Sequence, residues 1–397
     1  MYLLLPKFIP RFCILIYVLC VTVGAFTGGI WATFGIGGAV VLWLAASAQD
    51  KAYLKPSQPV TLFALATLAI WAAELPLSVN FAVSAKLWFN LASIFLPLLL
   101  LSTPRLQNLI FSRSFVPVIA YAMAIGALAL GAELISGGYI IHAFKKPTAA
   151  LTEYNRGIAH VVILSFPIVA GLWLADKKKE ALLLALILLF PASLTESHTA
   201  KLALLLGALC TVIAFCKPVL VQRGLAVMSV ALLGWPFYAQ RAFLAFPDAV
   251  AKLHDSFRHR LEIWDYLSYR IEQRPIFGWG LGTTHLLDFA QPHGELYRFA
   301  VQGAPHAHNF IVELWVETGL LGLALGLIFL LAILRHITKL HASLQPFALG
   351  AFAAAVTISL FGFDFWTDAL WSAFALSACA FGMLQKHIES GENLVRT

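Results

Sequence analysis

The stretch that decides the fold is His306-Ala307-His308-Asn309-Phe310-Ile311-Val312-Glu313-Leu314-Trp315-Val316-Glu317-Thr318-Gly319-Leu320-Leu321-Gly322. It predicts a membrane helix with histidine at its mouth. At 100° per residue one stripe would hold His308, Trp315, Gly319 and Gly322, with the glycines roughly 16–21 Å below the histidine. Such glycines let another helix pack closely, and a histidine with an ordinary pKa of about 6.5 can exchange a proton. The alternative is a polar helix cap above a glycine packing face.

The rest of the chain has the composition of a protein that crosses the membrane many times. Of its 397 residues, 60% are hydrophobic and only 12% are charged, and the mean hydropathy is +0.83. These values exclude an ordinary soluble domain, and the lack of period-two alternation disfavours a barrel. We expect an all-α polytopic integral membrane protein, a single membrane domain over residues 1–397 with about twelve transmembrane helices. The candidate spans are 12–26, 30–48, 59–74, 85–101, 115–134, 157–175, 180–193, 199–216, 219–236, 308–333, 346–363 and 367–385.

Basic residues beside the spans indicate the orientation of the chain. Placing the N-terminus in the cytoplasm puts short basic connections such as Asp176-Lys177-Lys178-Lys179-Glu180 on that side, in line with the positive-inside rule. Segment 237–307 then forms one large periplasmic loop that folds against the membrane domain. The net charge of +7 is mostly this topology, so we expect membrane lipids and no nucleic acid as partners. All five cysteines lie in apolar runs or at their edges, which disfavours disulfides and a zinc site.

Two cations stand where spans begin on the outer side. Asn155 can cap the span that follows it, which places Arg156 in the first turn, where a cation opposes the helix dipole. Lys201 lies about one turn inside the span after Ser197, another possible cap, and a buried lysine is often functional. A bound anion would offset both charges. The alternatives are structural pairs of Arg156 with Glu153, and of Lys201 with Glu196 or Glu133.

The large loop contains one clear amphipathic helix, residues 258–271. Its apolar face holds Leu261, Trp264, Leu267, Ser268 and Ile271, and Pro275 follows it. This helix would lie on the membrane mouth. Arg258 and Arg260 at its start could bind a phosphate bidentately, although isolated surface arginines are more often solvated. The glycine-rich stretch 275–285 lacks the lysine of a nucleotide-binding loop and predicts a tight turn. His285, Asp288 and His293 do not have the spacing of a metal site.

The quoted residues resemble a known family. His308-Asn309, then nine residues, then Gly319-Leu320-Leu321-Gly322 is similar to the HN-x9-GxxG signature of the O-antigen ligases and polymerases of Gram-negative bacteria. The similarity extends back through Arg260-x3-Trp264 and Pro275-x2-Gly278-x-Gly280, so the family-like catalytic region runs from 185 to 335. The expected topology, twelve spans with one large outer loop, is also similar to that of the family. Where many members have Ser-Arg before the eighth span, this chain has Ser197-His198, which leaves open whether Lys201 replaces the arginine.

The resemblance implies an O-antigen ligase, a GT-C-like glycosyltransferase of the bacterial inner membrane with its active site facing the periplasm. The donor would be an undecaprenyl-pyrophosphate-linked glycan and the acceptor the lipid A-core oligosaccharide. His308 would be the base, and the pyrophosphate would be held by Arg156 and Arg260, with Lys201 and Arg258 as further candidates. His306, Asn309, Gly319 and Gly322 would support the site. Since fixed cations can stabilise the leaving group in place of a metal, we expect an inverting, metal-independent reaction without a cofactor.

Two alternatives stay open. An O-antigen polymerase, or a protein-directed oligosaccharyltransferase, would share the donor chemistry. A polytopic lipid or sugar transporter is a rival of another class, because charged residues occur within or beside the spans at Glu74, Glu133, Asp364 and Asp368. No internal repeat pairs the two halves, and the outer cations gather on one face rather than near the midplane, which disfavours transport.

Overall fold

The computed structural model describes residues 15, 18–19, 21–27, 58–101, 115–144, 150–290, 293–362 and 364–389. The expected span 30–48 and part of 12–26 lie outside these residues. The described regular structure is entirely helical, which confirms the all-α expectation for this part of the chain. The longer helices are α4 (Gln58–Glu74), α5 (Phe81–Leu101), α7 (Phe115–Ile135), α9 (Tyr154–Leu174), α10 (Lys178–Leu194), α11 (His198–Cys216), α12 (Pro218–Ala231), α13 (Trp235–Ala245), α15 (Asp255–Gln273), α16 (Phe310–Ile337), α17 (Gln345–Phe361) and α18 (Asp368–Glu389). The shorter ones are α2 (Gly24–Thr27), α8 (Tyr139–Phe144), α14 (Pro247–Ala251) and the 3-10 turns η2 (Leu75–Leu77), η3 (Leu151–Glu153), η4 (Leu232–Gly234), η5 (Thr284–Leu286) and η6 (Gly294–Leu296).

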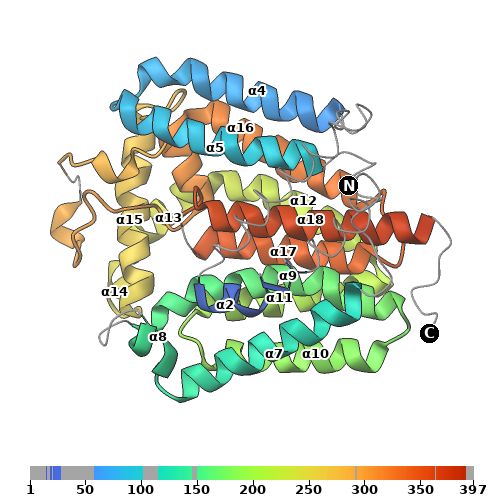
Figure 1. The fold of residues 1–397 in the computed structure, drawn as a ribbon. Coiled ribbons are helices and arrows are strands. Elements are labelled where there is room, and N and C mark those ends of the chain that lie inside the picture. The colour runs from blue at the N-terminus through green and yellow to red at the C-terminus, as the bar shows by residue number, and fades with distance from the viewer. Residues whose placement is uncertain are drawn as a thin grey trace.

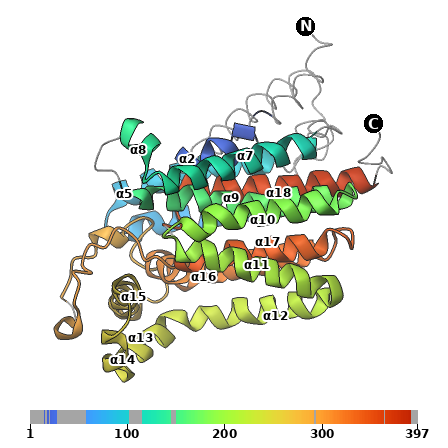
Figure 2. The same cartoon turned by 90° about the horizontal axis from the view of Figure 1, so that it is seen from below.

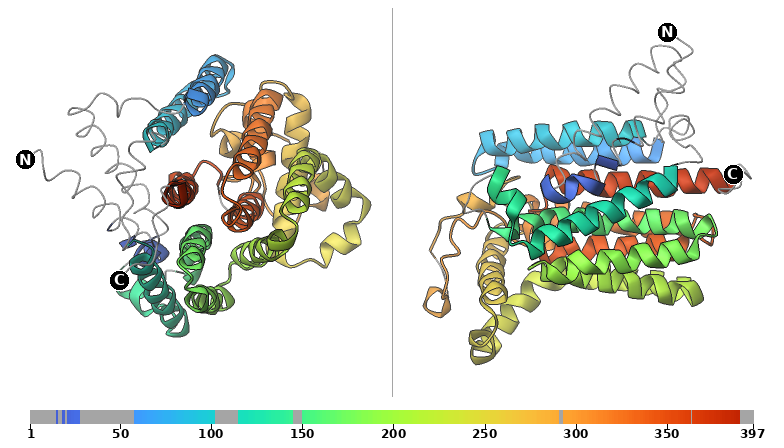
Figure 3. Two further views of the ribbon diagram at one scale, coloured as in Figure 1. Left: turned by 90° about the vertical axis from the view of Figure 1, so that its right-hand side faces the viewer. Right: turned by 60° about the horizontal axis from the view of Figure 1, so that its bottom comes forward.

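The long helices lie side by side in a bundle, and α15 runs across one end of it (Figure 1). Figure 2 views α15 along its axis while the bundle helices are seen lengthwise, and the left panel of Figure 3 views the bundle from its end. Helix α9 is the central element: it packs against α7, α10, α11, α17 and α18, and most of its residues are buried. Helix α15 packs against α13 and α16.

Close backbone packing between helices occurs at α11 and α17. A Cβ on Gly207 would lie 2.9 Å from the Gly350 carbonyl oxygen, and a Cβ on Gly350 would lie 2.6 Å from the Gly207 carbonyl oxygen. Small residues at such a crossing are the usual way that membrane helices approach each other.

Five described helical segments are long and apolar enough to cross a membrane: Val116–Ile135, Leu151–Leu174, His198–Cys216, Pro218–Ala245 and Phe310–Ile337. Thr61–Leu77 and Gln345–Phe361 are shorter apolar helices. The chain therefore has the character of a multi-pass membrane protein. The count of about twelve spans stays a prediction, because several expected spans are helices of only 17 residues, such as α10 and α17.

Helix α16 is kinked, and the straight stripe expected from the sequence is wrong. The helix begins at Phe310, so His308 lies before it, and Gly319 has a non-helical backbone with φ 64° and ψ −163°. Gly319 packs against the backbone at Ile276 and Phe277, where any Cβ would overlap the Ile276 carbonyl. The missing side chain of Gly319 allows close packing of the loop at Ile276 and Phe277, and not of a neighbouring helix. Gly322 sits against the Thr318 side chain of its own helix.

The loop that follows α15 takes over backbone hydrogen bonding at the kink. Trp279 N donates to Val316 O at 2.9 Å and Gly280 N to Glu317 O at 2.8 Å, while Leu320 N donates to Pro275 O at 2.8 Å. The bonds lost at the kink are thus replaced within the protein, as an apolar environment demands. The positive φ values of Gly278 and Gly280 confirm the tight turn expected for this stretch.

The predicted amphipathic helix is present as α15, but its polar face is covered. Trp264, Leu267 and Ile271 pack on the bundle as expected. On the other side the fully buried Asp265 accepts hydrogen bonds from His293 Nδ1 at 2.8 Å and Tyr297 Oη at 2.5 Å. Part of the segment that precedes His306 therefore packs over this helix, and α15 is an internal element of the loop region rather than a helix with one solvated face.

Candidate active site

The segment 306–309 is held between α15 and the start of α16. Trp264 Nε1, buried on α15, donates to Ala307 O at 2.8 Å. Asn309 caps α16, because its Oδ1 accepts from Ile311 N at 2.9 Å and from Val312 N at 3.1 Å. The helix cap is therefore Asn309 and not a histidine. The two anchors hold the backbone on either side of His308.

His308 has a left-handed backbone and a defined tautomer. Its φ is 53°, a conformation that costs a non-glycine residue about 1–3 kcal/mol and persists only where the surroundings impose it. The ring Nδ1 lies 3.0 Å from Gly362 O and 3.2 Å from His306 Nε2. A carbonyl oxygen only accepts, so Nδ1 carries the proton and Nε2 holds the lone pair.

Both histidines are neutral at neutral pH. Burial, followed by the neighbouring His306, lowers the pKa of His308 to about 3; Arg260 also lowers it, while the bond to Gly362 O raises it. Burial, followed by the charges of Arg156 and Arg260, lowers the pKa of His306 to about 4. The unperturbed value near 6.5 expected from the sequence is therefore wrong. Arg156 thus acts electrostatically on His306, and Arg260 acts on both histidines.

Arg260 lies on α15, one helical turn before Trp264. This i, i+4 spacing places the arginine on the same face as the tryptophan that holds Ala307. The Arg260 side chain is partly buried, and its burial lowers the pKa of the guanidinium, which still remains charged at any working pH. The Arg260-x3-Trp264 pattern thus places Arg260 on the face of α15 that binds Ala307, between the two histidines in sequence, through Trp264.

Arg156 and Lys201 lie in the first turns of α9 and α11, as expected. Asn155 does not cap α9, however, because that helix begins at Tyr154 and Asn155 Oδ1 accepts from Thr195 Oγ1 at 2.8 Å. Ser197 does cap α11, accepting from Ala200 N at 3.2 Å. Thr199 Oγ1 donates to Phe361 O at 2.7 Å, which brings the start of α11 beside Gly362 and hence beside His308.

Arg258 makes contacts that stabilise the loop region. Its Nε donates to Glu262 at 2.8 Å, and the fully buried Glu262 also accepts from Arg298 N at 3.0 Å and Phe299 N at 2.9 Å. Arg258 Nη2 donates to Leu296 O at 3.3 Å. Since its charge already serves a buried carboxylate, Arg258 differs from Arg260, its neighbour on the helix.

The sequence motifs did not identify two buried glutamates of α16 as functional candidates. Glu313 and Glu317 are each 1% exposed and lie one turn apart on α16. Glu317 accepts hydrogen bonds from the loop after α15 and from Trp366 Nε1. Acidic residues four apart inside an apolar helix are costly in a membrane and are therefore a signal of function, and this signal was available in the sequence.

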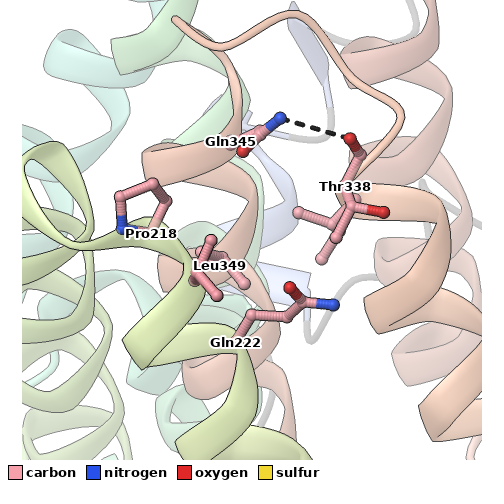
Figure 4. A pocket seen from close by; sticks show the side chains of 7 residues that line it. Pro218, Gln222, Thr338, Gln345 and Leu349 are labelled. Carbon is pink, nitrogen blue, oxygen red and sulfur yellow. Dashed lines mark hydrogen bonds between the residues drawn. The ribbon is translucent and has the colours of Figure 1, made fainter.

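The described residues contain no group of three or more His, Cys, Asp or Glu side chains that could hold a metal ion. The described pocket of about 240 Å³ between Pro218, Gln222, Thr338, Gln345 and Leu349 lies at the other end of α16 (Figure 4). Its lining carries no charged side chain, so it does not suit a pyrophosphate. The histidines and nearby cations at the α15 end are the better candidate site.

The fold and this site define a helical membrane protein with a neutral histidine and several cations at one end of its bundle. Residues 181–327 match the family model described as O-Antigen ligase. Similar proteins bear the name "Putative polysaccharide ligase": one from Rickettsia conorii is 24% identical over 248 residues, 59% of this chain and 58% of that protein. One from Rickettsia bellii is 27% identical over 217 residues, 53% of each chain. The chain thus spans less than two thirds of the length of these relatives.

The family model and these relatives support the assignment of the chain to the O-antigen ligase superfamily. The matched region overlaps the family-like region expected from sequence, and it contains Lys201, Arg260, His308 and both signature glycines but not Arg156. The similarity supports a ligase-type enzyme.

Proposed function

We propose that the protein transfers an O-antigen glycan from undecaprenyl pyrophosphate to the lipid A-core oligosaccharide on the periplasmic face of the inner membrane. One observation carries the proposal most strongly: His308 Nδ1 donates to Gly362 O, so Nε2 has the lone pair that can accept a proton. The similarity of residues 181–327 to the O-antigen ligase family supports a lipid-linked glycan as the donor class.

The proposed reaction is a single displacement at the anomeric carbon of the donor. His308 Nε2 takes the proton of the acceptor hydroxyl while the hydroxyl oxygen forms the new glycosidic bond. The bond between the anomeric carbon and the pyrophosphate oxygen breaks, and undecaprenyl pyrophosphate leaves with the bonding electrons. Attack opposite the leaving group inverts the anomeric carbon. The driving energy is in the donor, so no nucleotide takes part.

Fixed cations stabilise the negative charge of the leaving group. Arg260 and Arg156 are the proposed pyrophosphate ligands because the charges of both lower the pKa of His306, which lies 3.2 Å from His308. Lys201, at the start of α11, is a third candidate. Preorganised positive groups aimed at a developing charge are often the largest contribution to catalysis, and here they would act in place of a divalent metal. Arg258, which binds Glu262, is proposed to hold the loop region instead.

Donor binding should also strengthen the base. Burial and neighbouring cations keep His308 neutral, but a pKa of about 3 makes it a weak proton acceptor. A bound pyrophosphate places negative charge beside the same cations and offsets their effect. The pKa of His308 is then higher in the donor complex than in the free enzyme, although burial still lowers it, so the histidine is a stronger base in the complex.

The test is transfer by the purified protein, in EDTA, from polyprenyl-pyrophosphate-linked glycan to lipid A-core. We expect a core-linked product from the wild type and its loss in His308→Ala and Arg260→Ala. Glycan that only lengthens on its lipid carrier would establish the polymerase instead. If active lipids give neither product while reconstituted protein moves the lipid across a bilayer, the transferase proposal is wrong and transport replaces it.

A further inference from the structure

We propose that Glu317 is a positioning residue for His308: it holds segment 362–366 so that the Gly362 carbonyl keeps the His308 proton on Nδ1. The structure describes Gly362 and residues 364–366 of this segment. The inference rests on the proposed role of His308 as the base. Glu317 does not touch the reacting atoms, and it would act only through the backbone that orients the histidine.

Glu317 is bound by four donors from two separate parts of the chain. Its Oε1 accepts from Thr284 N at 3.1 Å and Thr284 Oγ1 at 2.7 Å. Its Oε2 accepts from Gly282 N at 2.6 Å and Trp366 Nε1 at 2.6 Å. The side chain is buried where α16 is kinked. One carboxylate therefore connects the loop after α15, helix α16 and segment 362–366.

The connection continues from segment 362–366 to the histidine. Trp366 N donates to Asp364 Oδ1 at 2.8 Å, and Phe365 N donates to Glu313 Oε2 at 3.3 Å. These bonds hold Asp364, Phe365 and Trp366. Gly362, directly after α17, accepts from His308 Nδ1 through its carbonyl oxygen. Glu313 and Glu317 of α16 thus bind Phe365 and Trp366. The Gly362 carbonyl of the same segment orients His308.

Only an acceptor fits the Glu317 position. Thr284 N faces one oxygen, and Gly282 N and Trp366 Nε1 face the other; all three groups can only donate. A glutamine at this position would turn its NH2 group toward at least one of these donors in either orientation. The mismatch leaves buried donors without acceptors, which is costly in a low-dielectric site. Glu317→Gln should therefore release Trp366 or the loop although the two side chains have the same shape.

Loss of the Glu317 hydrogen bonds would change the tautomer of His308. A neutral histidine carries its proton on either ring nitrogen, and the hydrogen bond made by one nitrogen decides which. If Gly362 O moves away, the Nε2–H tautomer becomes populated, and in that form Nε2 cannot accept the proton of the acceptor hydroxyl. Glu317 would thus set the fraction of enzyme with a competent base and leave the cations that bind the donor unchanged.

The experiment combines 15N NMR of histidine-labelled protein in detergent with steady-state transfer kinetics. The His308 signals are assigned by their loss in His308→Gln. We expect Nδ1–H in the wild type and a mixture of tautomers in Glu317→Gln and Trp366→Phe, which removes the one bond from Trp366 to Glu317 but keeps a buried ring. We expect kcat to fall about tenfold or more, a part of the 10²- to 10⁴-fold effect of a positioned base, with the KM for the donor unchanged.

Asp265→Asn is the matched control, because Asp265 is an equally buried carboxylate whose partners are His293 and Tyr297. It should leave the His308 tautomer as in the wild type. A wild-type tautomer in both Glu317→Gln and Trp366→Phe overturns the proposal, as does an equal tautomer change in Asp265→Asn. If Glu317→Gln does not fold, Trp366→Phe decides alone. The NMR result stands even if the wild type transfers no glycan, so failure of the proposed function is distinguished from failure of this inference.

Discussion

At the residue scale, the chemistry of the site depends on how His308 is held. Its backbone is left-handed, its Nδ1 is bound to Gly362 O, and its pKa is lowered to about 3. The motif identified the residue but could not give its state, because the carbonyl that sets the tautomer comes from a residue 54 positions later. Burial of the ring depends on the same tertiary contacts. A histidine motif therefore predicts a candidate base, whereas its tautomer and pKa require the fold.

The pH dependence of transfer tests this state. The kcat/KM profile reports the free enzyme, in which His308 loses its lone pair only as the pH falls toward about 3. We expect no loss of kcat/KM from His308 protonation between neutral pH and roughly pH 5, although an unperturbed histidine would titrate near 6.5. Because donor binding raises the pKa, the acid limb of kcat should lie at higher pH than that of kcat/KM.

Initial rates are measured across this pH range, and activity is checked after return to neutral pH. They test whether the pKa of His308 is lowered in the free enzyme and raised by the donor. An acid limb of kcat/KM near pH 6.5, absent from His308→Gln residual activity, would show that the free histidine has an ordinary pKa. Coincident limbs for kcat and kcat/KM would contradict the effect of the donor on the base.

Arg260 and Arg258 give a paired prediction. Arg260→Ala should weaken binding of a polyprenyl pyrophosphate about ten- to a hundredfold, since charge-assisted hydrogen bonds contribute about 1.5–3 kcal/mol. Arg258→Ala should mainly destabilise the fold, by about 1–3 kcal/mol, because it removes a partner of the buried Glu262. Donor binding and thermal unfolding, both measured in detergent, separate the two effects. The opposite pattern would assign the pyrophosphate to Arg258.

At the scale of elements, the kink in α16 determines how the site is built. Periodicity predicts a continuous helix from this apolar stretch, and the glycines then indicate a helix-packing face. The structure uses Gly319 for a left-handed backbone that admits the loop at Ile276 and Phe277. The pattern could not distinguish these uses, because both require a missing side chain. Helix α15 was predictable from its apolar face, but the cover over its polar face depends on long-range bonds to Glu262 and Asp265.

Gly319→Ala tests the kink. An alanine at φ 64° is strained by about 1–3 kcal/mol, and its Cβ also overlaps the Ile276 carbonyl, so the total loss of stability should exceed the backbone strain alone. The control is Gly224→Ala on α12, where a Cβ meets no atom within 4 Å and should be neutral or stabilise by up to about 1 kcal/mol. Thermal unfolding in one detergent compares them. Equal melting temperatures for Gly319→Ala and wild type would mean that α16 is continuous.

At the scale of the whole molecule, composition predicted a helical membrane protein, and the described residues are helical with five segments able to span a bilayer. Composition alone does not count the spans, because apolar helices of 17 residues are compatible with crossing, tilting or burial. The expected topology placed the starts of α9, α11 and α16 and the loop containing α15 on one side, but the contacts between these elements were not visible in the sequence. They depend on bonds between distant residues, such as Thr199 with Phe361 and Asn155 with Thr195.

Orientation in the membrane is testable with single cysteines in a background without the five native ones. Lys252→Cys lies in the loop region near α15, and Lys339→Cys lies just after α16 at the other end of the bundle; both positions are exposed. The positive-inside rule places the first in the periplasm and the second in the cytoplasm. A membrane-impermeant maleimide should label Lys252→Cys in intact spheroplasts and Lys339→Cys only after lysis. The reverse pattern would place the site on the cytoplasmic face.

The most direct test of the central claim is a single-turnover comparison of wild type and His308→Ala under saturating donor and acceptor in EDTA. Donor affinity is measured separately on the same samples. If His308 is the base and the cations bind the pyrophosphate, the variant binds donor as the wild type does while its transfer rate falls about 10²- to 10⁴-fold. Transfer by His308→Ala within a few-fold of the wild-type rate, at equal donor affinity, would contradict the account.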